Sequence, residues 1–293
     1  MNITLIQAPI ATGTTQKGMA LAPERYLQAG ADQSLASRGH SVETSVVART
    51  TEDDLEAVVE VNTGLAAEVR KATEAGRFPM VLGGACNVCL GVLAGLSPRT
   101  LGIVWFDAHG DFNTPDTTPS GYFDGMPLAI AAGRGHQNLR TRITEGDPVP
   151  EERVLLSGVR DLDRGERDSL ESSEVRVVST DSFKQHGMER SLLPALRQLA
   201  TFVDEVYLHL DMDVLDPEVA PGVNFPTPGG MMLDDLQRAI EMIGEHFRIA
   251  AASVTAYDPT RDEGDRTLLT GLSLLDTVAK AAGKSSSAIR VIS

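Results

Sequence analysis

The sequence predicts an α/β protein, a three-layer αβα sandwich around a central, mainly parallel sheet. Three observations support this fold class. Short apolar runs recur along the chain, and longer amphipathic stretches separate them. Most of these runs are strongly apolar, which favours parallel strands buried on both faces of the sheet. No internal repeat, low-complexity tract or linker interrupts this pattern, so residues 1–293 are expected to form a single domain.

Eight strands and seven helices are expected in alternation. The strands are the apolar runs 2–7, 42–47, 79–82, 101–107, 153–157, 175–178, 205–211 and 250–256. The helices are the amphipathic stretches 22–36, 53–75, 86–94, 125–132, 189–202, 233–246 and 267–282. No basic region precedes the first run, so it is expected to be a strand and not a secretory signal. The Gly-, Pro- and Thr-rich stretch 113–125 is expected to be a long loop after the fourth strand, where this fold usually carries its site.

Composition and charge exclude several functional classes. With 26 Lys and Arg against 41 Asp and Glu, the formal net charge is -15, which disfavours binding to nucleic acid or to anionic membranes. The most apolar stretch, 81–96, contains an asparagine and four glycines and is too short to span a bilayer. Two cysteines cannot form a disulfide framework. A cytoplasmic enzyme acting on a small molecule is therefore expected.

Two acidic clusters follow predicted strands. One contains Asp107, His109 and Asp111, and the other contains Asp211 and Asp213. Residues two apart in an extended segment point the same way, so each cluster converges on one point at the same edge of the sheet. Crowded carboxylates repel one another and shift their pKa values, and divalent cations relieve that repulsion. Ordinary turn and helix-capping aspartates are the alternative interpretation of such clusters.

The motifs Asp-Ala-His-x-Asp and Asp-x-Asp-x-x-Asp-Pro, in this order, resemble those of the ureohydrolases, the arginase and agmatinase family. The resemblance covers residues 81–259. It implies an α/β fold with a central parallel sheet and two Mn²⁺ ions per chain that serve hydrolysis of a guanidino group. It also implies that Asp107 and Asp211 bridge the ions, that Asp111 completes one site, and that His109 and Asp213 complete the other.

The family's Gly-Gly-Asp-His-Ser motif is altered here. Residues 83–87 read Gly-Gly-Ala-Cys-Asn, so Cys86 takes the place of the histidine ligand. Since a coordinated thiol loses its proton, we expect Cys86 to be a metal ligand. A metal-poor, non-catalytic relative and a Cys-x-x-Cys redox pair with Cys89 are the alternatives. Cys89 is otherwise expected to be a buried apolar residue.

By the same resemblance, Asn113 and Ser120 match residues that contact the carboxylate end of an amino-acid substrate. Asp163 matches the acidic residue that faces the α-amino group. These matches favour an amino-acid substrate over a simple amine, although Asn, Ser and Asp also cap loops. Asp111 is expected to be the catalytic residue that takes a proton from the nucleophile and passes it to the departing amine.

Two departures from the family lie at the reacting end. Asp124 replaces a proton-shuttling histidine, although an aspartate before a helix is also a common N-cap. Ala256 replaces a glutamate that grips the guanidinium group, and the loss of such a partner costs about 3–5 kcal/mol. We therefore expect poor activity on L-arginine. Tyr122 and Phe225 are expected either to shape the pocket or only to pack.

An N-hydroxyguanidine is less basic than a guanidine and would need neither missing side chain. In these features the sequence is similar to the Nω-hydroxy-L-arginine amidinohydrolases of D-cycloserine biosynthesis, an antibiotic pathway. This resemblance implies hydrolysis of Nω-hydroxy-L-arginine to L-ornithine and hydroxyurea. Arginase, agmatinase and formimidoylglutamase activities remain alternatives. The segment 285–293 after the last predicted helix favours a monomer over an oligomer.

Overall fold

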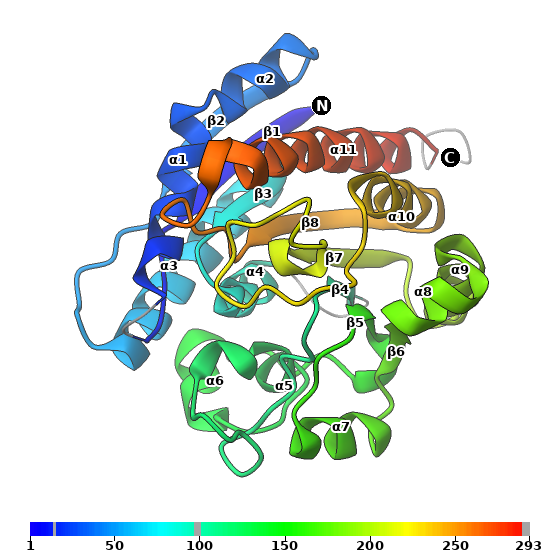
Figure 1. Cartoon of the computed structure of the whole chain (residues 1–293). Coiled ribbons are helices and arrows are strands. Elements are labelled where there is room, and N and C mark those ends of the chain that lie inside the picture. The colour runs from blue at the N-terminus through cyan, green and yellow to red at the C-terminus, as the bar shows by residue number, and fades with distance from the viewer. Residues whose placement is uncertain (14–15, 97–100, 289–293) are drawn as a thin grey trace.

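The computed structural model of the chain describes residues 1–13, 16–96 and 101–288 (Figure 1). Within them, eight strands form one sheet in the order β2-β1-β3-β8-β7-β4-β5-β6, and every pairing is parallel. The strands are β1 (Asn2–Ala8), β2 (Ser41–Val46), β3 (Phe78–Gly83), β4 (Leu101–Phe106), β5 (Val154–Val159), β6 (Arg176–Ser179), β7 (Glu205–Asp211) and β8 (Arg248–Thr255). The predicted parallel-sheet α/β fold is confirmed.

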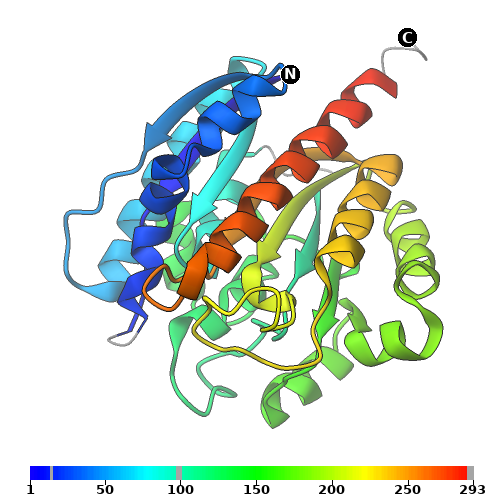
Figure 2. The same ribbon diagram turned by 45° about the horizontal axis from the view of Figure 1, so that its top comes forward.

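Helices cover both faces of the sheet, which gives the three layers (Figures 1 and 2). One face carries α1 (Ala22–Gln28), α2 (Ala31–Ser37), α8 (Thr180–His186), α9 (Met188–Leu199), α10 (Leu233–His246) and α11 (Arg266–Ala288). The other carries α3 (Asp54–Glu74), α4 (Cys89–Gly95), α5 (Pro127–Ala131), α6 (Gln137–Ile143) and α7 (Arg164–Glu171). Each face therefore has its own apolar core.

Strand β4 shows how one apolar run supplies both cores. Val104 and Phe106 point into the core under α9 to α11, whereas Ile103 and Trp105 point into the core under α3 to α6. All four side chains are fully buried. Successive side chains of a strand alternate between faces, so a strand between two helical layers must be apolar at every position.

Helix α4 lies unusually close to α3. A Cβ atom built on Gly91 would lie 2.6 Å from the Asn62 carbonyl oxygen, and one on Gly95 would lie 2.6 Å from the Val69 Cβ. These two glycines are one helical turn apart, so they form a smooth stripe along α4. The stripe lets the two helices pack backbone against backbone.

The helices differ from the prediction in two ways. The expected helix 22–36 is divided into α1 and α2 because Gly30, at φ 82°, turns the chain. Helices α6, α7 and α8 were not expected. They are only seven or eight residues long, and their polar composition hides the apolar stripe that marks a helix.

Each of the four central strands leads to a residue that the sequence analysis singled out. Cys86 follows β3, Asp107 follows β4, Asp211 ends β7 and Ala256 follows β8. These strands are adjacent in the order β3-β8-β7-β4, so their carboxyl ends bring the four segments to one edge of the sheet.

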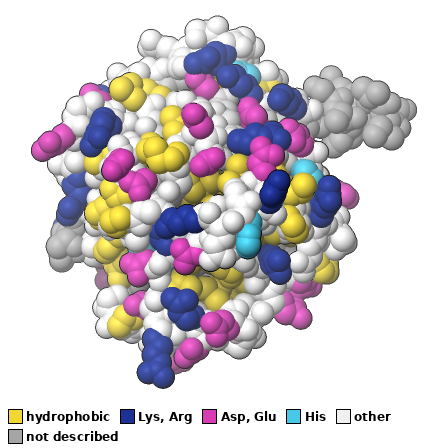
Figure 3. All heavy atoms as spheres, turned by 45° about the vertical axis from the view of Figure 1, so that its right-hand side comes forward, with side chains coloured by type: hydrophobic (Ala, Val, Ile, Leu, Met, Phe, Trp, Pro, Cys, Tyr) yellow, Lys and Arg dark blue, Asp and Glu magenta, His cyan; other side chains and the backbone are white. Residues whose placement is uncertain are grey.

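The surface is of mixed charge. On the face in Figure 3, Lys and Arg side chains are interspersed with Asp and Glu and form no broad basic patch. Among the described residues, none of the helices has both the length and the apolar character needed to cross a bilayer.

Candidate active site

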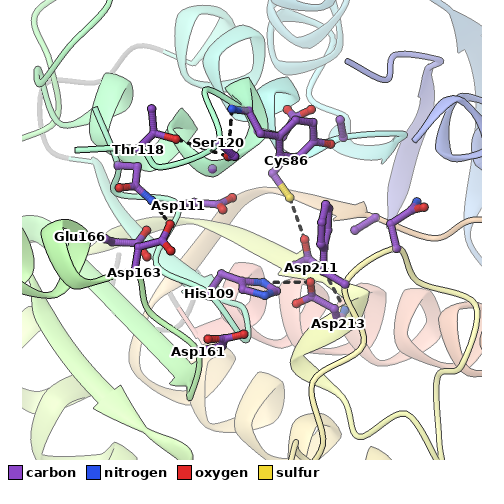
Figure 4. Close-up of a pocket in the computed structure, with 18 of the residues that line it drawn as sticks. Cys86, His109, Asp111, Thr118, Ser120, Asp161, Asp163, Glu166, Asp211 and Asp213 are labelled. Carbon is purple, nitrogen blue, oxygen red and sulfur yellow. Dashed lines mark hydrogen bonds and ion pairs between the residues drawn. The ribbon is translucent and has the colours of Figure 1, made fainter. Parts of the chain in front are cut away.

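Two groups of potential metal ligands meet at this edge of the sheet (Figure 4). One comprises Cys86, Asp107 and Asp211, and the other comprises Asp107, His109 and Asp213. Within each group the ligand atoms lie within 4.8 Å of one another. Asp107 belongs to both groups, so one carboxylate connects them. The structure thus brings together five of the six residues that the sequence assigned to metal binding.

Tight turns after β4 and β7 fix the carboxylates. The His109 N–H donates to Asp107 Oδ1 at 2.7 Å, and the Asp213 N–H donates to Asp211 Oδ1 at 2.7 Å. The Ala108 N–H, in the first turn, donates to Asp213 Oδ1 in the second at 3.2 Å. The second oxygens of Asp211 and Asp213 face Cys86 Sγ and His109 Nδ1, at 2.8 and 3.1 Å.

Two side chains outside the clusters support them. Trp105 Nε1 donates to Asp107 Oδ2 at 3.0 Å and holds that carboxylate in place. The Arg160 guanidinium donates to the carbonyl oxygens of Asp213, Val214 and Leu215, at 2.7, 3.1 and 3.2 Å. Arg160 therefore holds the turn after β7 in place through these three carbonyl groups. Sequence reasoning missed both supports because neither forms part of a recognisable motif.

Asp111 lies outside the two groups but faces the same pocket. Its backbone has φ 48°, a conformation that aspartate tolerates better than most residues. Its Oδ2 is buried and has no hydrogen-bond partner among the described residues. A buried acceptor without a partner is costly, and a bound cation would satisfy it.

The electrostatics of the cluster also fit cations. Burial and the neighbouring carboxylates raise the pKa values of Cys86, Asp111 and Asp211. Burial by itself would lower the pKa of His109, but Asp213 and Asp107 raise it above its ordinary value. A dense group of buried carboxylates is unstable when ionised unless positive charge balances it. The residues present therefore fit divalent metal ions.

Both cysteines are free and buried. Cys86 Sγ lies 2.8 Å from Asp211 Oδ2, inside the cluster, whereas Cys89 Sγ faces the Pro127 carbonyl oxygen at 3.8 Å. Cys89 is fully buried among the apolar side chains of the core under α3 to α6, as the sequence indicated.

A cavity of about 290 Å³ opens over the cluster. Figure 4 shows Asp163 and Glu166 on the opposite side of this cavity from Cys86 and Asp211. Asn113 Nδ2 donates to Asp163 Oδ2 at 3.0 Å, so the structure brings these two predicted residues together. Ser120 is exposed, lines the cavity, and accepts a hydrogen bond from the Tyr122 N–H at 3.2 Å.

Glu166 lines the cavity and was missed in the sequence. It is only 3% exposed, and its Oε1 accepts the Phe112 N–H at 2.9 Å. Burial raises the pKa of Glu166 to about 7, although the Phe112 hydrogen bond opposes the rise. Asp163 directly precedes α7 and Glu166 lies in its first turn, so a prediction of this helix would have placed the two residues near each other.

The wall of the cavity near Cys86 is apolar. Met19, Ala85 and Ala256 form a small hydrophobic cluster there. Ala256 has φ 64° and its N–H donates to the Gly84 carbonyl oxygen at 2.9 Å. Tyr122 and Phe225 also line the cavity, with their ring centroids 5.6 Å apart.

The interpretation of Asp124 as a helix N-cap is wrong. Helix α5 begins after Met126, and Asp124 lies earlier, in a 3₁₀ turn. Its Oδ2 accepts from Thr12 Oγ1 at 2.5 Å, and its Oδ1 accepts from Asn87 Nδ2 at 2.6 Å. Burial raises the pKa of Asp124, and these hydrogen bonds oppose the rise. Both oxygens of this cavity-lining carboxylate thus already have donors.

Two further residues near the clusters, His209 and Asp216, have structural roles. His209 is fully buried and stacks on Trp105 with ring centroids 3.5 Å apart, and burial lowers its pKa to about 3. Asp216 organises the next loop, because its carboxylate accepts the N–H groups of Glu218, Gly229 and Gly230.

The chain is similar to known arginases over nearly its whole length. The family model described as "Arginase family" matches residues 1–280. The arginase of Bacillus caldovelox is 35% identical over 291 residues, which cover 94% of this chain and 97% of that protein. The crystal structure of an arginase from Bacillus cereus superimposes with a TM-score of 0.89 at 34% identity, covering 95% of this chain and 98% of that one.

A more distant structure has the same fold. The arginase of Entamoeba histolytica, solved in complex with L-ornithine, superimposes with a TM-score of 0.86 at 25% identity. It covers 94% of this chain, and 98% of its own chain is matched. Together with the metal-ligand groups at the edge of the parallel sheet, these similarities show that the chain belongs to the arginase family of metal-dependent ureohydrolases, which cleave C–N bonds.

Proposed function

We propose that the chain is a binuclear manganese hydrolase that cleaves Nω-hydroxy-L-arginine to L-ornithine and hydroxyurea, and that it serves antibiotic biosynthesis of the D-cycloserine type. The observation that carries the substrate preference is the apolar wall of Met19, Ala85 and Ala256 beside Cys86. Asp124 also lines the cavity, but its two carboxylate oxygens already accept hydrogen bonds from Thr12 and Asn87. A weakly basic hydroxyguanidine suits this wall better than a permanently charged guanidinium.

The metal centre is proposed to hold two Mn²⁺ ions. The proposed ligands are Cys86, Asp107, His109, Asp111, Asp211 and Asp213. Cys86, Asp107 and Asp211 would hold one ion and Asp107, His109 and Asp213 the other, because Asp107 belongs to both ligand groups. Carboxylates with one imidazole suit hard to borderline cations, among which is Mn²⁺. Bound there, the ions would supply Lewis acidity that lowers the pKa of water and stabilises developing negative charge.

The other end of the cavity is proposed to hold the amino-acid part of the substrate. Asp163 and Glu166 face the α-ammonium group, and Asn113 and Ser120 face the α-carboxylate. The Asn113–Asp163 hydrogen bond keeps both side chains on one wall of the cavity. A simple amine would leave the polar groups for the carboxylate without a partner, which disfavours it.

Asp111 is proposed to be the catalytic residue. Hydrolysis adds the oxygen of water to the guanidino carbon and breaks the bond from that carbon to the δ-nitrogen of ornithine. Asp111 takes the proton that water loses and gives it to the departing amine. Asp111 lines the cavity in which this transfer would take place. The ornithine in the Entamoeba histolytica structure supports ornithine as a product of this site.

L-Arginine hydrolysis is the second candidate, favoured by the similar proteins that are named arginase.

The test is the release of ornithine from L-arginine and from Nω-hydroxy-L-arginine by the Mn²⁺-supplemented protein. We expect a strong preference for the hydroxylated substrate. Equal or better turnover of L-arginine would establish the second candidate. No ornithine from either would point to another guanidino substrate or a non-catalytic relative.

A matched pair of variants tests the reason for the preference. Ala256→Glu restores a carboxylate at the apolar wall, whereas Ala256→Gln adds a neutral side chain of the same size at the same positive φ. The Glu variant is expected to raise the ratio of kcat/KM for L-arginine over hydroxyarginine by about 10-fold or more above the Gln variant. Equal ratios in the two variants would contradict the role of the wall.

A further inference from the structure

The proposed ligand Cys86 has a buried neighbour that no metal-binding motif explains. Its Sγ lies 3.3 Å from Thr255 Oγ1, at the end of β8. Thr255 is fully buried, and so its hydroxyl needs hydrogen-bond partners within the protein. The Thr255 methyl group packs toward Gly83, where an added Cβ would meet it at 2.9 Å. The side chain is thus held with its hydroxyl toward the sulfur.

Thr255 is in turn linked to three other buried polar side chains. Thr255 Oγ1 lies 3.2 Å from His209 Nε2. His209 Nδ1 lies 2.8 Å from the Tyr207 hydroxyl and 3.0 Å from Ser253 Oγ, and these two hydroxyls are 2.6 Å apart. Tyr207 and His209 of β7 and Ser253 and Thr255 of β8 therefore form one network of polar side chains, and this network ends at Cys86.

The hydrogens of this network can be arranged so that the sulfur receives a donor. Tyr207 donates to His209 Nδ1, which leaves the hydrogen of the neutral imidazole on Nε2. That N–H donates to Thr255 Oγ1, and the threonine hydrogen is then free for Cys86 Sγ. A carbonyl oxygen, that of Leu210 at 3.3 Å, is the competing acceptor. A negatively charged thiolate is the stronger acceptor of the two.

We propose that Thr255, oriented by His209, is a positioning residue that donates a hydrogen bond to the Cys86 thiolate when that thiolate binds a metal ion. This inference rests on the ligand role of Cys86 in the proposed function, but not on the identity of the substrate. Outer partners of this kind orient a ligand and tune the metal, and their loss weakens metal binding by about 10-fold to 100-fold.

The experiment uses Co²⁺ in place of Mn²⁺ in the whole protein, without substrate. A Co²⁺–thiolate bond gives a near-ultraviolet charge-transfer band that carboxylates and imidazole do not give. We expect this band in the wild type and its loss in Cys86→Ser. In Thr255→Val, which keeps the shape of the side chain but removes the donor, the band should move to longer wavelength. Co²⁺ affinity should fall by about 10-fold or more.

Two further variants separate hydrogen bonding from packing. Thr255→Ser keeps the hydroxyl and should keep the wild-type band. His209→Phe keeps a ring against Trp105 but removes both nitrogens, and it should shift the band as Thr255→Val does. An unshifted band and unchanged affinity in Thr255→Val would overturn the inference, and an unshifted band in His209→Phe would remove His209 from it.

The possible failures are distinguishable. If the wild type shows no charge-transfer band, Cys86 is not a thiolate ligand, and both this inference and that ligand assignment are wrong. The preference for hydroxyarginine is measured by ornithine release and can stand or fall independently of the band.

Discussion

Ala256 contributes to an apolar wall at the end of the cavity beside Cys86. Ala256 lies with Met19 and Ala85 where the resemblance to ureohydrolases implies a glutamate. The Asp124 carboxylate, in the same cavity, accepts hydrogen bonds from Thr12 and Asn87 and does not cap a helix. At the scale of the residue, the wall beside Cys86 is therefore apolar, while the carboxylates of the two ligand groups remain clustered.

A buried glutamate opposite the metal ligands predicts a pH dependence of stability. The pKa of Glu166 rises from an ordinary value of 4.5 to about 7 in the folded protein. The folded state therefore holds the proton more tightly than the unfolded state. The contribution of Glu166 to the free energy of unfolding is most favourable below about pH 4.5, and about 3 kcal/mol is lost as the pH rises to about 7.

Glu166→Gln keeps the acceptor for the Phe112 N–H and removes the titration. In urea unfolding of the metal-free protein, we expect the stability of this variant relative to wild type to increase from about pH 5 to about pH 7.5. Glu171→Gln, exposed on the same helix, is the control and should show no such trend. Equal pH trends for wild type and Glu166→Gln would contradict the prediction.

At the scale of the element, the contact of α4 with α3 depends on glycine. A methyl group at Gly91 would press on the backbone of α3, since its Cβ would lie 2.6 Å from the Asn62 carbonyl oxygen. Gly91→Ala should therefore lower the free energy of unfolding by about 1–3 kcal/mol, although alanine favours helices. Urea unfolding with a common m-value measures the change.

Gly283, in α11, provides the matched control. A Cβ there would meet only Met1 Sδ, at 3.8 Å, among atoms of the described residues. Gly283→Ala should raise the free energy of unfolding by up to about 1 kcal/mol, through helix propensity. If Gly91→Ala were also stabilising, the close approach of the two helices would not be a constraint.

At the scale of the whole molecule, bound divalent ions should stabilise the fold, because their ligands lie at the ends of different strands. The ligand groups draw on segments after β3, β4 and β7, which exist as a site only in the folded chain. Ions that bind only the folded state at about 100 times their Kd add about 2.7 kcal/mol per site. Chelation should therefore lower Tm, and Mn²⁺ should restore it.

Asp107→Asn tests this coupling because Asp107 belongs to both ligand groups. This variant should lose most of the Mn²⁺-dependent rise in Tm, measured by thermal unfolding after chelation and metal addition. Asp168→Asn, exposed on α7, should retain the full rise. A wild-type Tm that is insensitive to both chelation and Mn²⁺ would show that no such centre forms.

Much of the fold follows from the local pattern of the chain. All eight observed strands overlap the predicted runs, and β3, β4 and β5 are largely apolar because both of their faces are buried. The edge strand β2 is the exception, because most of its side chains are polar and exposed. Helices α6, α7 and α8 were missed because they are short and polar, and Gly30 divides a helix that periodicity alone would continue. The expectation of a monomer depended on residues 285–293, of which 289–293 lie outside the described part, and it stays a prediction.

The sequence by itself determined which strand ends carry carboxylates, because residue type and the two-residue repeat of a strand are local properties. Only the tertiary structure decided which of them meet, because the order β3-β8-β7-β4 joins segments far apart in the chain. It brought Asp107, which the family resemblance assigns to both metal sites, within reach of both ligand groups, and it left Asp111 Oδ2 without a hydrogen-bond partner among the described residues. It also placed Glu166 in the cavity and Thr255 against Cys86, since packing between distant elements has no signature in either segment.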